Sequence, residues 1–118
     1  MAYDSENVFA KILRGEIPSE KVYEDEFSYA FKDIHPQAPV HLLVIPKGPY
    51  TDFDDFVLNA PAKEKEGYFK AISTVAHQAG LKEKGYRLLF NIGKDSGQAV
   101  PHLHAHILAG RTFSDKIV

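Results

Sequence analysis

The sequence predicts an α+β fold in which a mainly antiparallel five-stranded sheet packs against two helices. Three observations support this prediction. Short apolar and aromatic runs alternate with turn signals, two segments repeat their apolar residues at helical spacing, and hairpin-length connections join most of the predicted strands. The 118 residues fit a single domain, residues 1–118, with one hydrophobic core.

The first predicted helix lies near the N-terminus. Its apolar residues fall on one face: Val8, Phe9, Ile12 and Leu13. Ser5 or Asn7 supplies the N-cap, and Gly15 and Pro18 end the helix. Two strands with a reversal at residues 24–26 are then expected in the aromatic stretch KVYEDEFSYAF. The two prolines of HPQAP interrupt regular structure, and the apolar run VHLLVIPK predicts a buried strand that ends at Pro46.

The second half predicts one long helix and two strands. Residues 48–61 are expected as loop or an irregular helical turn, with Asn59 and Pro61 at the entrance of the helix. The helix ends near Gly80, and its apolar positions are Tyr68, Phe69, Ile72, Val75, Ala76 and Ala79. Strands are predicted in GYRLLFNI, residues 85–92, and in AVPHLHAHILAG, residues 99–110.

The composition favours a small-molecule ligand. The 14 basic and 16 acidic residues nearly cancel, and no basic run of the kind that grips a nucleic-acid backbone is present, so no nucleic-acid partner is expected. The absence of cysteine excludes disulfides, thiol catalysis and thiolate metal sites. The N-terminus has early acidic residues and no long apolar run, so no signal peptide and no membrane partner are expected, and the cytoplasm is the expected location.

Three of the six histidines occupy alternate positions in PHLHAHILAG: His102, His104 and His106. On a strand they share one face, at intervals of about 6.6 Å. Two charged rings at that spacing repel by roughly 2.5 kcal/mol at an effective dielectric near 20, so at least one ring stays neutral near pH 7. A neutral imidazole can attack phosphorus or a carbonyl group, and the middle ring is best placed for this, with its neighbours bracketing the same substrate group.

Two alternatives stay open on these residues alone. The histidines can be exposed without a role, or they can bind zinc or copper, for which imidazole is a good ligand. Three rings spread along roughly 13 Å of strand diverge from a single ion, so at most two would chelate, and His41 is the candidate for a further ligand.

HLHAHIL resembles the signature of the histidine-triad (HIT) superfamily. Three longer blocks, at residues 8–26, 31–47 and 85–111, are similar to its Hint branch, which binds purine nucleotides, and LAGR resembles that branch's LGGR. The resemblance implies a HIT-like fold, no cofactor and no metal. It also implies a homodimer, with the long helix and residues 85–92 as the candidate interface.

The activity implied is hydrolysis or transfer at the α-phosphate of purine nucleoside 5′-phosphoramidates or aminoacyl-adenylates, that is, of AMP or GMP derivatives, through a nucleotidyl-histidine intermediate. Alternatives are a purine-nucleotide-binding regulatory module with weak or no catalysis, and a dinucleoside polyphosphate hydrolase. By the same resemblance His104 is the nucleophile, His102 and His106 support phosphate and proton movements, and His41 matches a further histidine of the site. Asp33 matches the acidic residue that hydrogen-bonds the ribose hydroxyls.

The remaining implied contacts fall into two groups. The positions near the phosphate are Asn91, Gly97, Gln98 and Ala99. The apolar walls of the base pocket are Val8, Phe9, Ile12, Ile17, Phe31 and Ile34. Two positions depart from the family pattern: Ala99 stands where Hint relatives commonly carry a serine that handles the leaving group, and Pro101 replaces a bulky residue. These departures predict slower phosphoramidate turnover or a different leaving-group preference.

Overall fold

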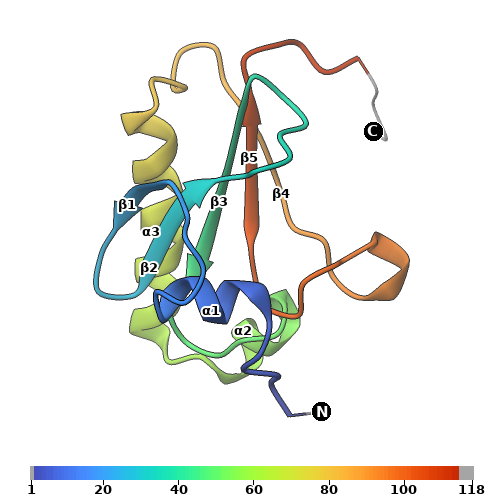
Figure 1. Ribbon diagram of the computed structural model, residues 1–118. Coiled ribbons are helices and arrows are strands. Elements are labelled where there is room, and N and C mark those ends of the chain that lie inside the picture. Colours follow the sequence, from blue (N-terminus) through green and yellow to red (C-terminus); the bar gives the residue numbers. More distant parts are fainter. Residues whose placement is uncertain (1, 115–118) are drawn as a thin grey trace.

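A computed structural model describes residues 2–114 and confirms the α+β fold (Figure 1). Within these residues five strands form one antiparallel sheet in the order β1-β2-β3-β5-β4. The strands are β1 (Lys21–Glu24), β2 (Ser28–Lys32), β3 (Val40–Pro46), β4 (Arg87–Leu89) and β5 (Ala105–Ala109). The helices are α1 (Val8–Leu13), α2 (Phe53–Asn59) and α3 (Ala62–Gln78), with a short 3₁₀ turn η1 (Lys94–Ser96).

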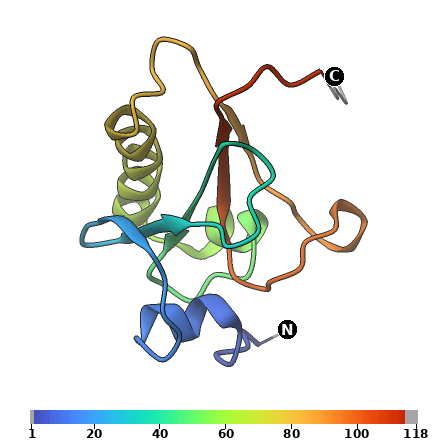
Figure 2. The same ribbon diagram turned by 45° about the horizontal axis from the view of Figure 1, so that its top comes forward.

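The two faces of the sheet carry different clusters because side chains alternate along β3 and β5. One face packs against α3, and its sheet residues include Leu42, Val44, Ala105 and Ile107. On this side the hydroxyl of Tyr68 donates to the carbonyl of Val44 at 2.7 Å. The opposite face has a smaller cluster, formed by Phe9, Phe31, Leu43 and Ile45. Figure 2 shows α3 and the short α1 on opposite sides of the sheet, so α1 covers only part of its face.

Local capping explains where α1 begins. The side-chain oxygen of Asn7 accepts the amide of Ala10 at 2.9 Å, which selects Asn7 from the two predicted N-caps. The hairpin between β1 and β2 is held by Asp25, whose Oδ1 accepts the amides of Phe27 and Ser28, each at 2.9 Å.

The prediction of two helices is wrong, because α2 forms where loop or an irregular turn was expected. Asp52 caps this helix by accepting the amide of Asp55 at 2.9 Å. Phe56 is fully buried, with its ring against those of Tyr50 and Tyr68. In α3, Phe69 was expected on the buried face but is 47% exposed, and Ala79 follows the helix at an exposed position. No helix among the described residues is long and apolar enough to cross a membrane.

The last two strands are shorter than predicted. β5 starts at Ala105 and not at residue 99, because Pro101 has no amide hydrogen and the amide of Leu103 donates to the carbonyl of Tyr50 at 2.8 Å. β4 covers residues 87–89 of the predicted 85–92. Because β5 starts at Ala105, His102 and His104 precede this strand.

Candidate active site

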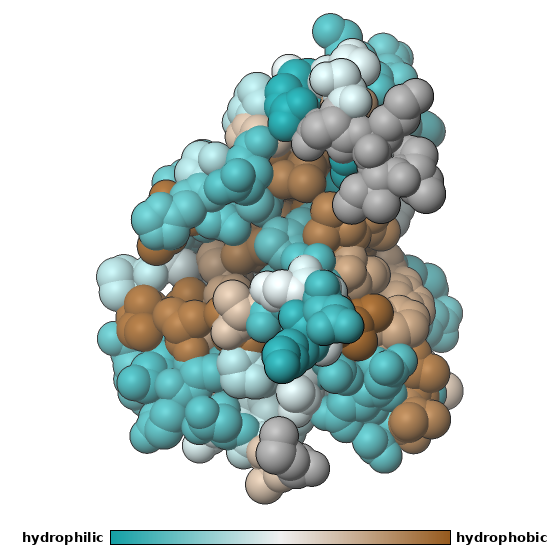
Figure 3. All heavy atoms as spheres, turned by 90° about the vertical axis from the view of Figure 1, so that its right-hand side faces the viewer, coloured by the Kyte–Doolittle hydropathy of each residue, from teal (hydrophilic) through white to brown (hydrophobic). Residues whose placement is uncertain are grey.

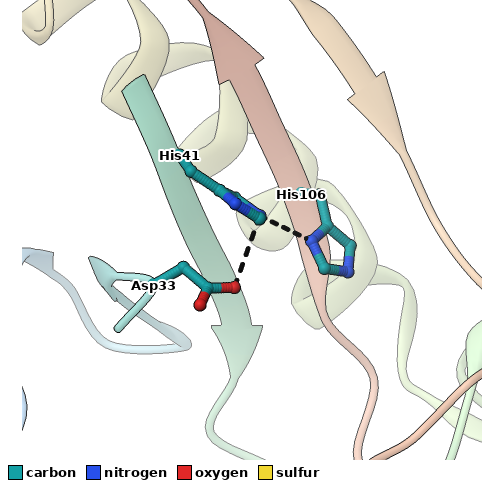
Figure 4. A group of neighbouring side chains, drawn as sticks. All are labelled: Asp33, His41 and His106. Carbon is teal, nitrogen blue, oxygen red and sulfur yellow. Dashed lines mark hydrogen bonds and ion pairs between the residues drawn. The ribbon is translucent and has the colours of Figure 1, made fainter. Parts of the chain in front are cut away.

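His41 and His106 meet on the face of the sheet that α1 covers only in part. The antiparallel register pairs Leu43 with His106 and His41 with Leu108, so the two histidines lie diagonally on neighbouring strands. His41 Nε2 lies 2.9 Å from His106 Nδ1. Asp33 follows β2 and donates its amide to the His41 carbonyl at 3.0 Å. This bond brings Asp33 Oδ2 within 3.4 Å of His41 Nε2 (Figure 4).

Hydrogen bonds fix which nitrogens of these rings carry protons. The amide of Gln37 donates to His41 Nδ1 at 3.0 Å, so the neutral ring of His41 carries its proton on Nε2. That proton is donated to His106 Nδ1, so neutral His106 is protonated on Nε2. His106 Nε2 is buried and has no hydrogen-bond partner among the described residues, and it points away from His41 in Figure 4. This N–H is therefore a donor without an acceptor, in a ring that lies on the wall of a cavity.

His104 has the opposite tautomer. Its Nδ1 lies 2.7 Å from the carbonyl oxygen of His102, which can only accept, so Nδ1 carries the proton and Nε2 keeps a lone pair. The ring packs against Phe9 and His106, with centroids 4.9 and 5.0 Å away. Nε2 has no hydrogen-bond partner among the described residues. A neutral ring with a free lone pair is the form that attacks an electrophile.

His102 takes no direct part in this cavity. Its ring is fully buried, Nε2 donates to the carbonyl of Pro46 at 2.9 Å, and Nδ1 accepts from the hydroxyl of Tyr3 at 2.5 Å. The three rings share one side of the sheet as expected, since Phe9 contacts both His102 and His104. Both nitrogens of His102 are engaged and its ring is not on the cavity wall, so a direct contact of His102 with the substrate stays a prediction.

Burial lowers the pKa of all four histidines. The pKa falls to about 4 for His102 and to about 4 for His106. The pKa values of His41 and His104 are also lowered by burial, while the charge of Asp33 raises the pKa of His41, His104 and His106. The lowered pKa values keep the rings neutral near pH 7, which goes beyond the expectation that at least one ring is neutral, and burial is a larger cause than the mutual repulsion on which that expectation was based.

A cavity of about 440 Å³ opens beside these rings. Its polar wall contains Asp33, His41, His104 and His106. Its apolar wall contains the following predicted residues: Val8, Phe9, Ile12, Ile17, Phe31, Ile34 and Ala99. Ile34 is 83% exposed and so lies at the open rim. A mainly apolar cavity of this size with a few convergent polar groups is typical of small-molecule sites.

Three of the predicted phosphate-side residues, Asn91, Gly97 and Gln98, are not on the cavity wall. Gln98 instead holds its own loop, because its Oε1 accepts the amide of Gly93 at 2.9 Å and its Nε2 donates to the carbonyls of Thr51 and Val100, each at 3.0 Å. Gly97 ends η1 with a φ of 83°. Their contacts with a phosphate stay predictions.

Three contributors to the site were not predicted. His35 lies on the cavity wall, Gln37 fixes the His41 tautomer through its amide, and Tyr3 binds His102 from 99 positions away. Only Gln37 has a local signal: it lies between Pro36 and Pro39, which restrict the turn that aims its amide.

Asp33, His41 and His106 could also hold a metal ion, because one ligand atom from each lies within 4.8 Å of the others. An ion on His41 Nε2 would have to displace the proton that the Gln37 amide keeps there. The hydrogen bonds therefore favour a paired set of histidines over a metal centre.

Comparison with known proteins matches the HIT domain family model to residues 14–113. A 13.2 kDa HIT-like protein of Azospirillum brasilense is 56% identical over 98% of this chain and 94% of its own length. The purine nucleoside phosphoramidase of Escherichia coli K12 is 42% identical over 90% of this chain and 88% of its own length. A solved HIT family hydrolase from Clostridium thermocellum has a TM-score of 0.83 and 42% identity, covering 98% of this chain and 99% of that one.

Proposed function

Because the chain belongs to the HIT family, we propose that it is a hydrolase of purine nucleoside 5′-phosphoramidates or aminoacyl-adenylates, with His104 as the nucleophile. The observation that carries this proposal is the bond from His104 Nδ1 to the carbonyl of His102, which leaves the Nε2 lone pair free in a ring on the cavity wall. The name of the 42% identical E. coli phosphoramidase supports the substrate class.

The reaction follows from this tautomer. His104 Nε2 attacks the α-phosphorus, the bond from phosphorus to the leaving group breaks, and a leaving amine takes up a proton from the solvent, to which the water step later returns one. The nucleotidyl-imidazolium that forms keeps its Nδ1–H on the His102 carbonyl, a bond that strengthens as the ring becomes positive. Water then attacks phosphorus, the bond to Nε2 breaks, and AMP and a proton are released. The ring returns to its starting tautomer.

His106 supplies the hydrogen bond that the ground state leaves unused. Its buried Nε2–H faces no acceptor among the described residues, and charge develops on the phosphate oxygens or the leaving atom during transfer. His41 keeps this ring in the donating tautomer. Asp33 lies beside both histidines and is the proposed partner of the ribose hydroxyls, while Phe9, Ile12 and Phe31 are proposed to contact the base.

The test is release of AMP from adenosine 5′-phosphoramidate and from AMP joined to the lysine side chain. We expect turnover by the wild-type chain, an acid-labile nucleotide adduct on His104, and loss of both in His104→Ala. His77→Ala, at an exposed position of α3, is the control and should leave the rate unchanged. Turnover that persists in His104→Ala would contradict the proposal, as would a wild-type chain that releases no AMP.

A second candidate is a purine-nucleotide-binding module with little or no turnover. The observation that favours it is Ala99, which brings no hydroxyl to the cavity wall. Calorimetric binding of AMP by a chain that leaves both substrates intact would support this candidate. Turnover of a dinucleoside polyphosphate in preference to the phosphoramidate would instead support the polyphosphate hydrolase.

We also propose a homodimer through β4 and α3. β4 is an edge strand of the sheet, with one flank unpaired in the described chain. Leu88 on β4 is 44% exposed and Ile92 just beyond it is 40% exposed. Figure 3 looks onto this side of the molecule and shows apolar surface on both sides of a hydrophilic protrusion. Edge strands that expose apolar side chains commonly pair with another chain.

A further inference from the structure

The N-terminal segment reaches the histidine triad through Tyr3. The hydroxyl of Tyr3 lies 2.5 Å from His102 Nδ1. Because His102 Nε2 must donate to the carbonyl of Pro46, Nδ1 is unprotonated and the Tyr3 hydroxyl is the donor. The Tyr3 oxygen in turn accepts from Asn7 Nδ2 at 2.9 Å. The hydrogen bonds therefore run in one direction, from Asn7 through Tyr3 and His102 to Pro46.

This chain of hydrogen bonds fixes the segment around His102, which is not paired with a strand of the sheet. Pairing between β3 and β5 begins at Ala105, so the backbone of His102 lies outside the ladder. One main-chain bond anchors the segment, from the amide of Leu103 to the carbonyl of Tyr50. The two ring bonds of His102 are then a major part of what fixes its position.

The carbonyl oxygen of His102 is the atom that accepts from His104 Nδ1, at 2.7 Å. A rotation of the His102 peptide would weaken that bond and allow His104 to adopt the other tautomer, with the proton on the nitrogen that must attack. Asn7 links the same chain of bonds to α1, because its Oδ1 caps the helix that carries Phe9. Phe9 contacts the His104 ring.

We propose that Tyr3 is a positioning residue: it holds His102 so that the His102 carbonyl keeps His104 in the attacking tautomer. This inference rests on the proposed function and extends it to a part of the chain before residue 14, where the match to the family begins. Tyr3 does not line the cavity beside His104, so its effect is on the rate of the chemical step and not on substrate binding.

The test compares Tyr3→Phe with Tyr23→Phe. Each variant removes one hydroxyl and one side-chain hydrogen bond, but Tyr23 bonds Asp25 in the β1–β2 hairpin. For Tyr3→Phe we expect kcat for adenosine 5′-phosphoramidate to fall about tenfold with KM unchanged, as misplacement of a reacting group does. The ¹⁵N resonance of His102 Nδ1 should move toward that of a lone pair without a hydrogen bond, and the His104 ring signals should change with it. Tyr23→Phe should change neither.

A second variant, Asn7→Ser, keeps a capping oxygen for α1 but removes the donor to Tyr3. It should also lower kcat, but by a smaller factor than Tyr3→Phe does. A Tyr3→Phe chain with the kcat of Tyr23→Phe, or with unchanged His104 ring signals, would overturn the inference. If the wild-type chain releases no AMP, the proposed function fails, and the His104 signals of Tyr3→Phe alone then decide whether Tyr3 positions that ring.

Discussion

Backbone groups determine which ring nitrogen carries the proton in His41 and in His104. The Gln37 amide can only donate and the His102 carbonyl can only accept, so His41 and His104 are held in opposite tautomers. One consequence is a buried N–H on His106 with no partner among the described residues. A buried N–H without an acceptor costs free energy. In the proposed reaction the substrate supplies that acceptor.

Asp33→Asn tests the electrostatic part of this arrangement. The charge of Asp33 raises the pKa of His41, His104 and His106, so its removal lowers all three. Because neutral His104 is the attacking form, the acid limb of the profile of kcat/KM against pH should move to lower pH. Loss of the proposed charged hydrogen bonds from Asp33 to the ribose should also raise KM by roughly tenfold or more, equivalent to about 1.5 kcal/mol.

A substrate without ribose hydroxyls separates the two effects. With a dideoxy analogue, Asp33→Asn should leave KM nearly unchanged but should still move the acid limb. Asp95→Asn, at an exposed position of η1, removes the same charge away from the cavity and should do neither. An acid limb that stays in place in Asp33→Asn would show that this carboxylate does not act on the histidines.

Elements with strong local signals could be predicted from the sequence. α1 is bounded by a capping Asn7 and by Gly15, and β3 is an apolar run that ends at Pro46. α2 could not, because Phe56 is its buried residue and the helix depends on packing of that ring against Tyr50 and Tyr68 of other parts of the chain.

The candidate site likewise has features that the sequence could predict and one that it could not. The shared face of the three histidines follows from the two-residue period of a strand. The placement of Asp33 beside His41 depends on the pairing of β2 with β3. The bond from Tyr3 to His102 spans 99 positions and leaves no pattern in the sequence. Resemblance to a family could find the first two but not the third.

The end of β5 provides a test at the scale of an element. Gly110 has a φ of 96°, and an added Cβ would lie 2.7 Å from Pro39 Cβ. Gly110→Ala therefore combines backbone strain with a clash against the turn before β3. Strain of this kind costs about 1–3 kcal/mol, and the clash adds to it. The free energy of unfolding, measured in urea, should fall by at least that amount.

Gly93→Ala is the matched control. Gly93 also has a positive φ, of 77°, but an added Cβ would meet nothing within 4 Å. Gly93→Ala should therefore lower the free energy of unfolding only by the cost of the backbone strain. If Gly110→Ala destabilised the chain no more than Gly93→Ala does, the contact with Pro39 would not constrain the end of β5.

At the scale of the whole molecule, uneven cover of the sheet creates both the site and the proposed interface. α3 packs along one face, whereas the short α1 leaves the cavity open on the other. The β4 edge has no described neighbour beyond it. The molecule thus has two incompletely covered regions: the cavity beside the histidines and the β4 edge, which we propose as the contact with a second copy of the chain.

Leu88→Lys tests the second region. A lysine on the exposed side of β4 would place a charge in the proposed dimer contact, and charges on edge strands oppose pairing. We expect the wild-type chain to have the mass of a dimer in light scattering and the variant to shift toward the monomer. Leu58→Lys, at a position of α2 that is 78% exposed, should not change the mass. A wild-type monomer would contradict the interface.

The buried histidines should make the fold acid-sensitive. His102 and His106 have pKa values of about 4 in the folded chain against an ordinary value of 6.5, so the unfolded chain binds more protons between these limits. The contribution of these two rings to the free energy of unfolding is therefore fully present above pH 6.5. It is lost as the pH falls toward 4, at up to about 1.4 kcal/mol per pH unit for each ring.

Urea unfolding at a series of pH values from 7 to 4.5 measures this slope directly. His102→Asn removes one of the titrating rings, so its free energy of unfolding should depend on pH less steeply than that of the wild-type chain, whatever its stability at pH 7. His77→Gln, at an exposed position of α3, should keep the wild-type slope. A wild-type free energy of unfolding that stays constant down to pH 5 would mean that the rings gain protons as easily in the folded chain as in the unfolded one. The neutral tautomers on which the proposed attack by His104 depends would then not be held by burial.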